Sequence, residues 1–324
     1  MSGAVQRRGA AIVSVASAVP DDAVSSAEIE QRLGLQPGWL VRRTGVRERR
    51  RATPDGTLTA LAAPAASRAL NRAGIHPAAV DMVLVATMTP DAITPNAAPS
   101  LAHAVGARRA VAMDIGAACS GFVFGLCMAA ATIEAGRADT ALVVGADLMS
   151  RVVDPGDRVT AGIFGDGAGA VVVRAIDAPS RIGPAVLGAD GGDGDAIHTP
   201  LPSGPVSMDG HRTFLRAVAA LTDISRQALV RAGLTVDDID LFVPHQANAR
   251  ITKAVGDALG LEADRVVDCI AEYGNTTAAT LPIALTEADR DGRLRHGCRV
   301  LLAAFGAGLT WGAVTVEWGV PTVD

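Results

Sequence analysis

The chain has 324 residues, of which 49% are hydrophobic and 19% are charged, and its formal net charge is −5. This length and apolar content are enough for one large core or for two fused ones. The net negative charge gives no global reason to expect nucleic acid as a partner. Only 3% of the residues are aromatic and 35 are glycine, which is typical of the tightly packed small-residue layers of α/β enzymes.

The cysteines and two apolar segments bear on the cellular compartment. The four cysteines are scattered without the spacing of metal ligands, so we expect free thiols in a reducing compartment and no metal. The apolar run after Arg7 and Arg8 resembles a weak signal peptide, but it is short and interrupted by serines. Residues 115–133 carry no charge and suggest a transmembrane helix, but their glycines favour close packing inside a protein. We therefore expect a cytoplasmic protein without a membrane partner.

The first third of the chain predicts strands alternating with helices. A strand is expected over residues 10–16, and a helix begins near Ser25, whose hydroxyl suits a helix N-cap. The basic segment 38–49 contains a tryptophan, and a solvated surface loop is the usual interpretation of such a charge run. Residues 57–73 predict an alanine-rich helix, and residues 81–87 predict a buried strand.

The stretch 111–133 contains the first candidate for chemistry. Residues 111–115 predict a buried strand, small residues follow, and a long apolar helix pattern begins just after Cys119. A strand that turns sharply into a helix lifts the side chain at the turn out of the core and into a site. Unpaired backbone N–H groups at the helix start favour a thiolate over a thiol. Cys119 is therefore either a nucleophile or a buried structural cysteine, and this stretch alone does not decide between them.

The second half of the chain repeats the first. The segment ALNRAGI at 69–75 recurs as ALVRAGL at 228–234, and in each copy an aspartate seven residues past the glycine opens an apolar strand. The strands ALVVGA and GAVVV have matching counterparts, RVLLAAF and GAVTV, in the same order. A period of this length indicates a duplicated domain rather than a solenoid. We expect two α/β units fused in tandem, covering residues 1–175 and 176–324.

Duplication brings equivalent strand ends together if the two units pack about a pseudo-twofold axis. Cys119 follows a strand of the first unit, and the matching strand of the second unit, predicted at 266–269, leads to Asn275. His245 follows the strand DLFVP. All three are predicted at strand-to-helix turns, where ligands bind in α/β folds. Taken alone, the histidine is more often structural and the asparagine is a common helix cap. Together they form a nucleophilic set of thiol, imidazole and amide.

Several blocks of the sequence resemble those of the 3-oxoacyl-(acyl-carrier-protein) synthase III family, within the thiolase superfamily. They are GWLVRRTGVRERR, DIGAACSGF, GIFGDGAGAVVV, VPHQANARI, EYGNTTAATLP and AFGAGLTWG, in the order and spacing of that family over essentially the whole chain. The resemblance implies a thiolase-like duplicated fold with five αβαβα layers, and a homodimer. It also implies a β-ketoacyl-acyl carrier protein synthase III that needs neither a cofactor nor a metal.

The mechanism that the resemblance implies begins with Cys119, which attacks a short acyl-CoA, forms an acyl-enzyme and releases CoA. Malonyl-acyl carrier protein then loses carbon dioxide while His245 and Asn275 donate hydrogen bonds to its thioester oxygen. The resulting carbanion attacks the acyl group in a Claisen condensation, with the backbone N–H groups of Cys119 and Ala307 stabilising the second oxyanion. This reaction initiates fatty acid or polyketide synthesis.

The resemblance also implies the residues that bind the substrates. Trp39 and Arg158 would sandwich the adenine of CoA by stacking and cation–π attraction. Arg43 and Asn248 would contact CoA, and Arg250 would dock the acidic carrier protein, which raises the encounter rate more than the affinity.

Two positions depart from, or vary within, the family pattern. The resemblance assigns Met149 and Thr94 to the acyl pocket, and Thr94 aligns where some relatives have a phenylalanine that reaches into the pocket of the partner subunit. The smaller threonine predicts primers longer or more branched than acetyl. Leu215 occupies a position where some relatives have a lysine for the carrier protein, which leaves the identity of the acceptor open.

Three other functions are compatible with parts of the sequence. The segment 165–170 fits the G-x-G-x-x-A pattern of dinucleotide oxidoreductases, but it precedes a strand instead of opening a helix. A non-catalytic module that binds acyl carriers is disfavoured because the cysteine, histidine and asparagine are all present. An acyltransferase of a secondary-metabolite pathway would move the acyl group to a hydroxyl, an amine or a carrier without decarboxylation. Leu215 favours that alternative mildly, and Asn275 argues for retained decarboxylation.

Overall fold

Two β-sheets form the framework of the computed structural model, which describes residues 8–200 and 204–320. The strands of the first sheet are β1 (Gly9–Ala18), β4 (Met82–Ala86), β5 (Val111–Ile115), β6 (Thr140–Leu148) and β7 (Asp166–Ile176). Those of the second sheet are β8 (Val186–Ala189), β11 (Leu241–Pro244), β12 (Arg299–Gly306) and β13 (Thr310–Glu317). The strand orders are β1-β7-β6-β4-β5 and β11-β12-β13-β8.

Helices and two small ribbons complete the fold. The helices are α1 (Ser26–Leu33), α2 (Trp39–Thr44), α3 (Leu58–Arg72), α4 (Ala97–Val105), α5 (Gly121–Glu134), α6 (Gly210–Ala232), α7 (Ala249–Leu259), α8 (Ile270–Tyr273) and α9 (Thr280–Arg290). The ribbons pair β2 (Ala23–Ser25) with β3 (Glu48–Arg50), and β9 (Ile197–His198) with β10 (Ser207–Met208). Short 3-10 turns include η2 (Ala118–Ser120), η3 (Met149–Arg151) and η7 (Thr277–Ala279).

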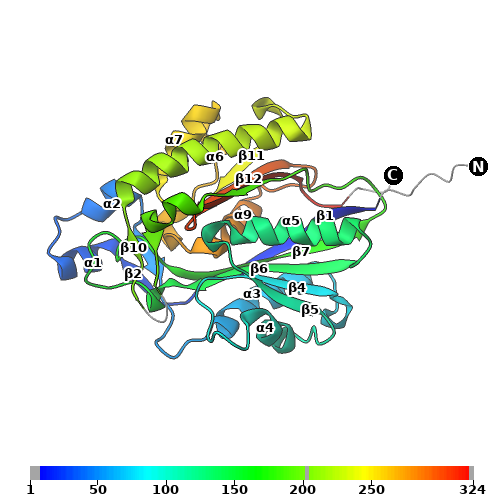
Figure 1. Ribbon diagram of the computed structural model, residues 1–324, viewed down its shortest axis with the longest axis horizontal. Helices are drawn as coiled ribbons and strands as arrows, with labels where there is room; N and C mark the ends of the chain where they lie inside the picture. Colours follow the sequence, from blue (N-terminus) through cyan, green and yellow to red (C-terminus); the bar gives the residue numbers. More distant parts are fainter. Residues whose placement is uncertain (1–7, 201–203, 321–324) are drawn as a thin grey trace, which may run out of the picture.

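The sheets and helices stack in five layers (Figure 1). The helices α5 and α9 lie between the two sheets, since α5 packs against β4, β6 and β13, and α9 packs against β1, β7 and β11. The helices α3 and α4 cover the outer face of the first sheet, and α6 and α7 cover the outer face of the second. The αβαβα architecture expected from the sequence is therefore confirmed.

One face of α5 packs between the two sheets, and residues 121–133 of this helix carry no charge. Phe122, Leu126 and Ile133 are each fully buried between the sheets, whereas Met128 is 42% exposed, so one face of this helix packs in the core and another reaches the surface. Among residues 8–200 and 204–320, no helix is both long enough and apolar enough to cross a bilayer.

The repeated aspartates perform the same structural task in both halves. The Asp81 carboxylate accepts a hydrogen bond from the backbone N–H of Thr140 at the start of β6. The Asp240 carboxylate accepts one from the backbone N–H of Arg299 at the start of β12. In each case the aspartate ties the strand that follows it to its parallel neighbour, and the glycines before them follow α3 and α6 in the left-handed conformation.

The predicted helix starts are confirmed, but the segment 38–49 is more ordered than a surface loop. Ser25 caps α1 in a capping box with Glu28, and the Thr57 hydroxyl accepts a hydrogen bond at the start of α3. Residues 38–49 form α2 and most of β3, which pairs with β2.

Two strand predictions were wrong in part. The strand over 111–115 forms, but it is the edge strand of its sheet, and Val111 and Met113 are 57% and 36% exposed. An apolar run does not distinguish a central strand from an edge strand. Residues 266–269 form no strand beyond a single bridge between Phe242 and Val266, so the second sheet lacks a counterpart of β5.

Candidate active site

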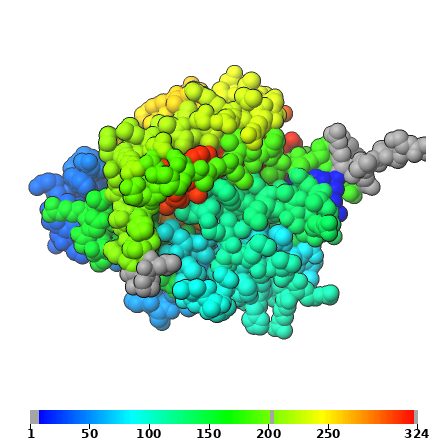
Figure 2. Space-filling model, viewed as in Figure 1, coloured from blue at the N-terminus to red at the C-terminus, as the bar shows by residue number. Residues whose placement is uncertain are grey.

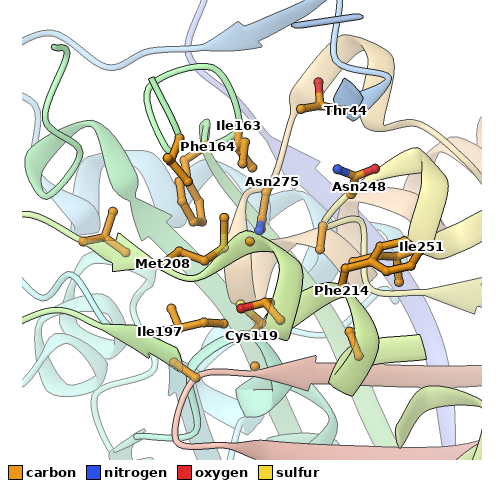
Figure 3. A pocket seen from close by; sticks show the side chains of 18 of the residues that line it. Thr44, Cys119, Ile163, Phe164, Ile197, Met208, Phe214, Asn248, Ile251 and Asn275 are labelled. Carbon is orange, nitrogen blue, oxygen red and sulfur yellow. The ribbon is translucent and has the colours of Figure 1, made fainter. Parts of the chain in front are cut away.

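A cavity of about 680 Å³ lies where the two halves of the chain meet. Its walls come from α2, η2 and η3 on one side and from α6, α7 and the end of β12 on the other. Figure 2 shows the yellow-green surface of α6 above the teal surface of the first half, with green and red segments between them. Cys119, His245 and Asn275 all line this cavity, and Figure 3 shows Asn275 pointing toward Cys119.

Cys119 occupies the sharp turn between β5 and α5. It is the middle residue of η2, and α5 begins two residues later. Ala118, just before it, has a φ of 44°, which is a strained left-handed conformation for a residue with a side chain. The Cys119 side chain is 8% exposed and faces the cavity. This is the strand–turn–helix geometry that the sequence predicted.

Burial opposes the expected effect of the helix start, which favours a thiolate at Cys119. Burial raises the pKa of the Cys119 thiol to about 12, and the nearby carboxyl group of Asp147 raises it further. The loss of solvation outweighs the effect of the helix N-terminus, so the resting side chain keeps its proton. Any reaction at this sulfur therefore needs a group that accepts a proton.

The end of β12 lies directly against Cys119. A Cβ atom added to Gly306 would sit 2.7 Å from the backbone nitrogen of Cys119, so only glycine fits at this position. The next residue, Ala307, lines the cavity beside it. The hydroxyl of Ser120 also donates a hydrogen bond to the carbonyl oxygen of Thr310, over 3.0 Å. These contacts hold the second half against the turn that carries Cys119.

His245 follows β11, and its backbone N–H donates to the carbonyl oxygen of Ala303 on β12, over 2.8 Å. The ring is 3% exposed, and its Nδ1 atom lies 2.7 Å from the hydroxyl oxygen of Thr280. Burial lowers the pKa of His245 to about 3, because the charged ring would lose its solvation. The imidazole is therefore neutral near pH 7, and Nε2 is the ring nitrogen left to meet a group in the cavity.

Asn275 presents a hydrogen-bond donor to the cavity. Its side-chain Oδ1 atom accepts from the backbone N–H of Thr277, over 2.8 Å, which orients the amide nitrogen toward the cavity. Its backbone is bonded to Ile163 and Gly165, at 2.9 and 3.0 Å. The prediction that Asn275 follows a strand was wrong, because the short helix α8 precedes it and η7 follows it.

The glycine-rich segment 165–170 lies at the start of β7. From Asp166 onward its residues pair with β1 on one side and β6 on the other. The segment therefore forms no turn between a strand and a helix, as a phosphate-binding loop would. Its place in a central strand contradicts the dinucleotide-binding interpretation.

The cavity mouth carries the residues predicted to contact CoA. Trp39, Arg43 and Arg158 all line it, and the Arg43 guanidinium carbon lies 4.8 Å from the centre of the Trp39 ring. The guanidinium of Arg158 donates to the carbonyl oxygen of Leu33, over 3.1 Å. It is therefore Arg43 that stacks on the indole in this chain. The Asn248 amide donates to the carbonyl oxygen of Arg43, over 3.1 Å, and so joins α7 to α2.

Arg250 lies on α7 and lines the cavity, and Leu215 lies on α6 next to Phe214 in the chain. The guanidinium of Arg250 lies 5.4 Å from the centre of the Phe214 ring, and the side-chain oxygen of Asn248 accepts from the Arg250 backbone N–H. Arg250 is exposed and Leu215 is 55% exposed. Arg250 therefore places a positive charge beside the aromatic ring of Phe214, and Leu215 exposes an apolar side chain on α6.

The inner part of the cavity is apolar. Met149 is fully buried and lines it, whereas Thr94 lies on the exposed loop before α4, outside the cavity of its own chain. The apolar lining that sequence reasoning missed consists of Met88, Ile163, Phe164, Ile197, Val206 and Met208. These side chains come from separate segments, so no local pattern marks them. In the described ranges 8–200 and 204–320, no cluster of three or more metal-ligating side chains is found.

A buried network of hydroxyl groups behind the site was also missed. The carboxyl group of Asp147, which is fully buried, accepts from Thr87 and Thr89 at 3.0 and 2.9 Å and also contacts the hydroxyl of Thr277. Burial raises the pKa of Asp147. Thr277 connects this network to the site. Its backbone N–H donates to Asn275, and its carbonyl oxygen accepts from Thr280, whose hydroxyl contacts His245.

Two family models match the chain. The model of 3-oxoacyl-[acyl-carrier-protein (ACP)] synthase III matches residues 113–191, and the model of the C-terminal part of the same family matches residues 229–318. The chain is 43% identical to β-ketoacyl-[acyl-carrier-protein] synthase III 2 of Streptomyces coelicolor, over 96% of this chain and 94% of that one.

Solved structures give the same result over nearly the full length. The 3-oxoacyl-(acyl carrier protein) synthase III of Pseudomonas aeruginosa PAO1 has a TM-score of 0.93 and 43% identity, covering 97% of this chain and 100% of that one. The priming β-ketosynthase of the R1128 polyketide pathway has a TM-score of 0.93 and 38% identity, covering 98% of both chains. The duplicated five-layer fold is that of the thiolase-like enzymes. The chain belongs to the 3-oxoacyl-[acyl-carrier-protein] synthase III family.

Proposed function

We propose that the protein joins a short acyl-CoA to malonyl-acyl carrier protein by decarboxylative Claisen condensation, and so initiates fatty acid or polyketide synthesis. The observation that carries this proposal is the meeting of Cys119, His245 and Asn275 on one cavity at the seam of a chain from this family. The relative in the R1128 pathway is named a priming β-ketosynthase, which supports the initiating role.

In the first half-reaction the sulfur of Cys119 attacks the thioester carbon of acyl-CoA. Because the thiol keeps its proton at rest, the proton must leave as the sulfur–carbon bond forms. The neutral ring of His245 lines the same cavity and can accept it. The carbon–sulfur bond to CoA then breaks, and the proton passes to the departing sulfur, so CoA leaves as a free thiol.

In the second half-reaction malonyl-acyl carrier protein occupies the cavity mouth. Loss of carbon dioxide places negative charge on the thioester oxygen, where His245 and the amide of Asn275 would each donate a hydrogen bond. The carbanion then attacks the acyl group on Cys119, and the backbone N–H groups of Cys119 and Ala307 would hold the oxyanion. When the carbon–sulfur bond breaks, Cys119 leaves as a thiolate, and it takes up one proton from the solvent to reform the thiol. These steps need no cofactor.

Substrate binding at the mouth follows from charge and shape. Trp39, Arg43, Arg158 and Asn248 would hold CoA, with the flat indole and guanidinium groups suited to the adenine. Arg250 would meet an acidic carrier protein at the rim, with Leu215 adding an apolar contact where some relatives place a lysine.

A second candidate function is acyl transfer to a hydroxyl, an amine or a carrier without decarboxylation. The exposed Leu215 is the observation that favours it, because an apolar side chain on the surface of α6 does not attract an acidic carrier. The donor that Asn275 presents to the cavity favours decarboxylation instead.

The function is tested by intact-mass spectrometry in two stages. Exposure to a panel of acyl-CoAs is expected to add one acyl group at Cys119. Subsequent addition of malonyl-acyl carrier protein is expected to remove that group, release carbon dioxide and give a 3-oxoacyl carrier protein. Removal of the acyl group by other nucleophiles, without carbon dioxide, would establish the second candidate instead. A protein that never acquires the acyl group contradicts both.

The same panel of acyl-CoAs shows which primer acylates Cys119 fastest. Thr94 is small where some relatives have phenylalanine, so primers longer or more branched than acetyl are expected to acylate Cys119 at least as fast as acetyl. Thr94→Phe is expected to shift the preference back toward acetyl, because the larger ring would fill the partner's acyl pocket. If acetyl-CoA alone acylates the natural protein, the assignment of Thr94 is wrong.

We also infer a homodimer that pairs through β5. Val111 and Met113 expose an apolar row on this edge strand, and Ile93, close to Thr94 in sequence, is 83% exposed. An unpaired apolar edge strand binds a second strand readily. Replacing Val111 and Met113 together by aspartate is expected to give monomers in sedimentation analysis. Val230→Asp, an exposed apolar site on α6, serves as the control and should leave the dimer intact. A monomeric natural protein would refute this assembly.

The chain divides between the two sheets. We propose that residues 1–175 and 176–324 are the two duplicated units, the first carrying Cys119 and the second carrying His245 and Asn275. The five-stranded sheet draws its strands from Gly9–Ile176 and the four-stranded sheet from Val186–Glu317, which supports this division. We also propose a cytoplasmic location, because the four cysteines are free thiols, as is usual in a reducing compartment.

A further inference from the structure

The hydrogen bonds around His245 point to a residue outside the proposed catalytic set. The Nδ1 atom of His245 lies 2.7 Å from the Oγ1 atom of Thr280. The same hydroxyl donates to the carbonyl oxygen of Thr277, over 3.0 Å. Thr280 is the first residue of α9 and is 2% exposed, so bulk water does not compete for its hydroxyl.

The single proton of this hydroxyl distinguishes the two neutral forms of the histidine ring. When Thr280 donates to Thr277, its oxygen can only accept at the other contact, so Nδ1 of His245 must carry the ring hydrogen. Both contacts are then hydrogen bonds. When Thr280 donates to Nδ1 instead, its oxygen faces the carbonyl oxygen of Thr277 at 3.0 Å with no proton between them. The first form satisfies both contacts and is favoured at rest.

The acceptor of the Thr280 proton is itself held firmly. Thr277 has a φ of 52°, which is unfavourable for a β-branched residue and persists only where the surroundings enforce it. Its hydroxyl contacts the buried carboxyl group of Asp147, and its backbone N–H donates to Asn275 over 2.8 Å. Thr277 therefore has a fixed position relative to both Asn275 and His245.

We propose that Thr280 is a positioning residue that keeps the ring hydrogen of His245 on Nδ1 in the resting protein. Nε2 is then unprotonated and accepts the proton of Cys119 during acylation, before passing it to the departing sulfur of CoA. This inference rests on the proposed function. For decarboxylation, rotation of the Thr280 hydroxyl toward Nδ1 lets the ring carry its hydrogen on Nε2 and donate it to the thioester oxygen. A hydroxyl can support both forms because it both donates and accepts.

Valine at position 280 keeps the branched shape but removes the hydroxyl. In Thr280→Val the Nδ1 hydrogen loses its acceptor, so the ring hydrogen is expected to move to Nε2. Acylation of Cys119 by acyl-CoA should then slow by about 100-fold, the usual scale of general-base catalysis. Carbon dioxide release from malonyl-acyl carrier protein, measured after acylation has gone to completion, should be unchanged. Thr280→Ser should restore the acylation rate.

A matched control separates this effect from lost stability. Thr286 lies in the same helix, is 6% exposed, and its hydroxyl donates to the carbonyl oxygen of Pro282 over 2.8 Å. Thr286→Val thus removes a buried hydroxyl of the same kind without touching His245, and it should leave both half-reactions unchanged. Equal slowing of both half-reactions in Thr280→Val would mean that Thr280 only supports the fold, and would overturn the proposal.

The decisive readout needs no reaction. Nitrogen-15 NMR of protein labelled at histidine distinguishes Nδ1–H from Nε2–H, and the signal of His245 is assigned by its loss in His245→Gln. The natural protein and Thr280→Ser are expected to carry the hydrogen on Nδ1, and Thr280→Val on Nε2. A natural protein with Nε2–H refutes the proposal. Failure of the proposed function would look different, because Nδ1–H would be found while no acyl-CoA labels Cys119.

Discussion

Cys119→Ala is expected to abolish acylation of the protein by every acyl-CoA. The variant has no sulfur to attack the thioester, so intact-mass spectrometry should show no acyl adduct. Release of free CoA should fall by at least about 10⁴-fold, the scale on which removal of a catalytic nucleophile lowers turnover. The fold should be retained, since Cys119 lies at the cavity wall and the smaller side chain meets no new clash.

A second cysteine in the same region provides the control for this result. Cys127 lies two turns further along α5, is half-buried, and does not line the cavity. Burial raises the pKa of Cys127 to about 12 as well, so the two thiols are alike in acidity and differ in surroundings. Cys127→Ala should take up the acyl group like the natural protein. An adduct that persists in Cys119→Ala and disappears in Cys127→Ala would show that the wrong cysteine has been assigned.

Asn275→Ala is expected to separate the two half-reactions in the opposite sense to Thr280→Val. Acylation of Cys119 should proceed at nearly the natural rate, because the amide of Asn275 is assigned to the malonyl thioester. Carbon dioxide release from malonyl-acyl carrier protein should fall by roughly 100- to 1000-fold, as is usual when one preorganised oxyanion donor is lost. Both steps are measured on the same preparation, the first by mass and the second by released carbon dioxide.

The hydrogen bond from Thr277 to Asn275 complicates the alanine variant and calls for a companion. Alanine removes the acceptor of the Thr277 N–H as well as the donor to the cavity. Asn275→Asp keeps an oxygen for Thr277, replaces the donor by a second acceptor oxygen and adds a carboxylate charge that repels the enolate, so it should lose decarboxylation at least as strongly. Asn71→Ala, on the exposed face of α3, should change neither step. Equal loss of acylation and decarboxylation in both Asn275 variants would contradict the assigned role.

Much of the framework could be predicted because it depends on local pattern and on repetition. The repeated segments 69–75 and 228–234 are the ends of α3 and α6, and the aspartates that follow them open β4 and β11. Short side chains around Cys119 marked the turn that presents it. Such features depend on residues that are close in sequence, so they can be identified without knowing which segments meet in space.

The features that could not be predicted depend on contacts between distant segments. The strand 111–115 has an apolar pattern, but only the strand order makes it an edge. The acidity of Cys119 depends on burial, which opposes the local effect of the helix start. Thr280 is 35 residues from His245 in the chain, and nothing near either residue indicates that they touch. The acidity and the hydrogen bonds of the site residues therefore depend largely on how distant segments pack together.

The contact between the end of β12 and the Cys119 turn also has a consequence for the order of folding. Ser120 and Thr310 are bonded across 190 residues of chain, and closing so long a loop comes late in folding. During synthesis the segment that carries Cys119 leaves the ribosome well before β12 exists. One wall of the cavity is then missing, together with His245 and Asn275. We therefore expect the newborn chain to carry an ordinary thiol, and the proposed reactivity toward acyl-CoA to arise only when the last strands are in place.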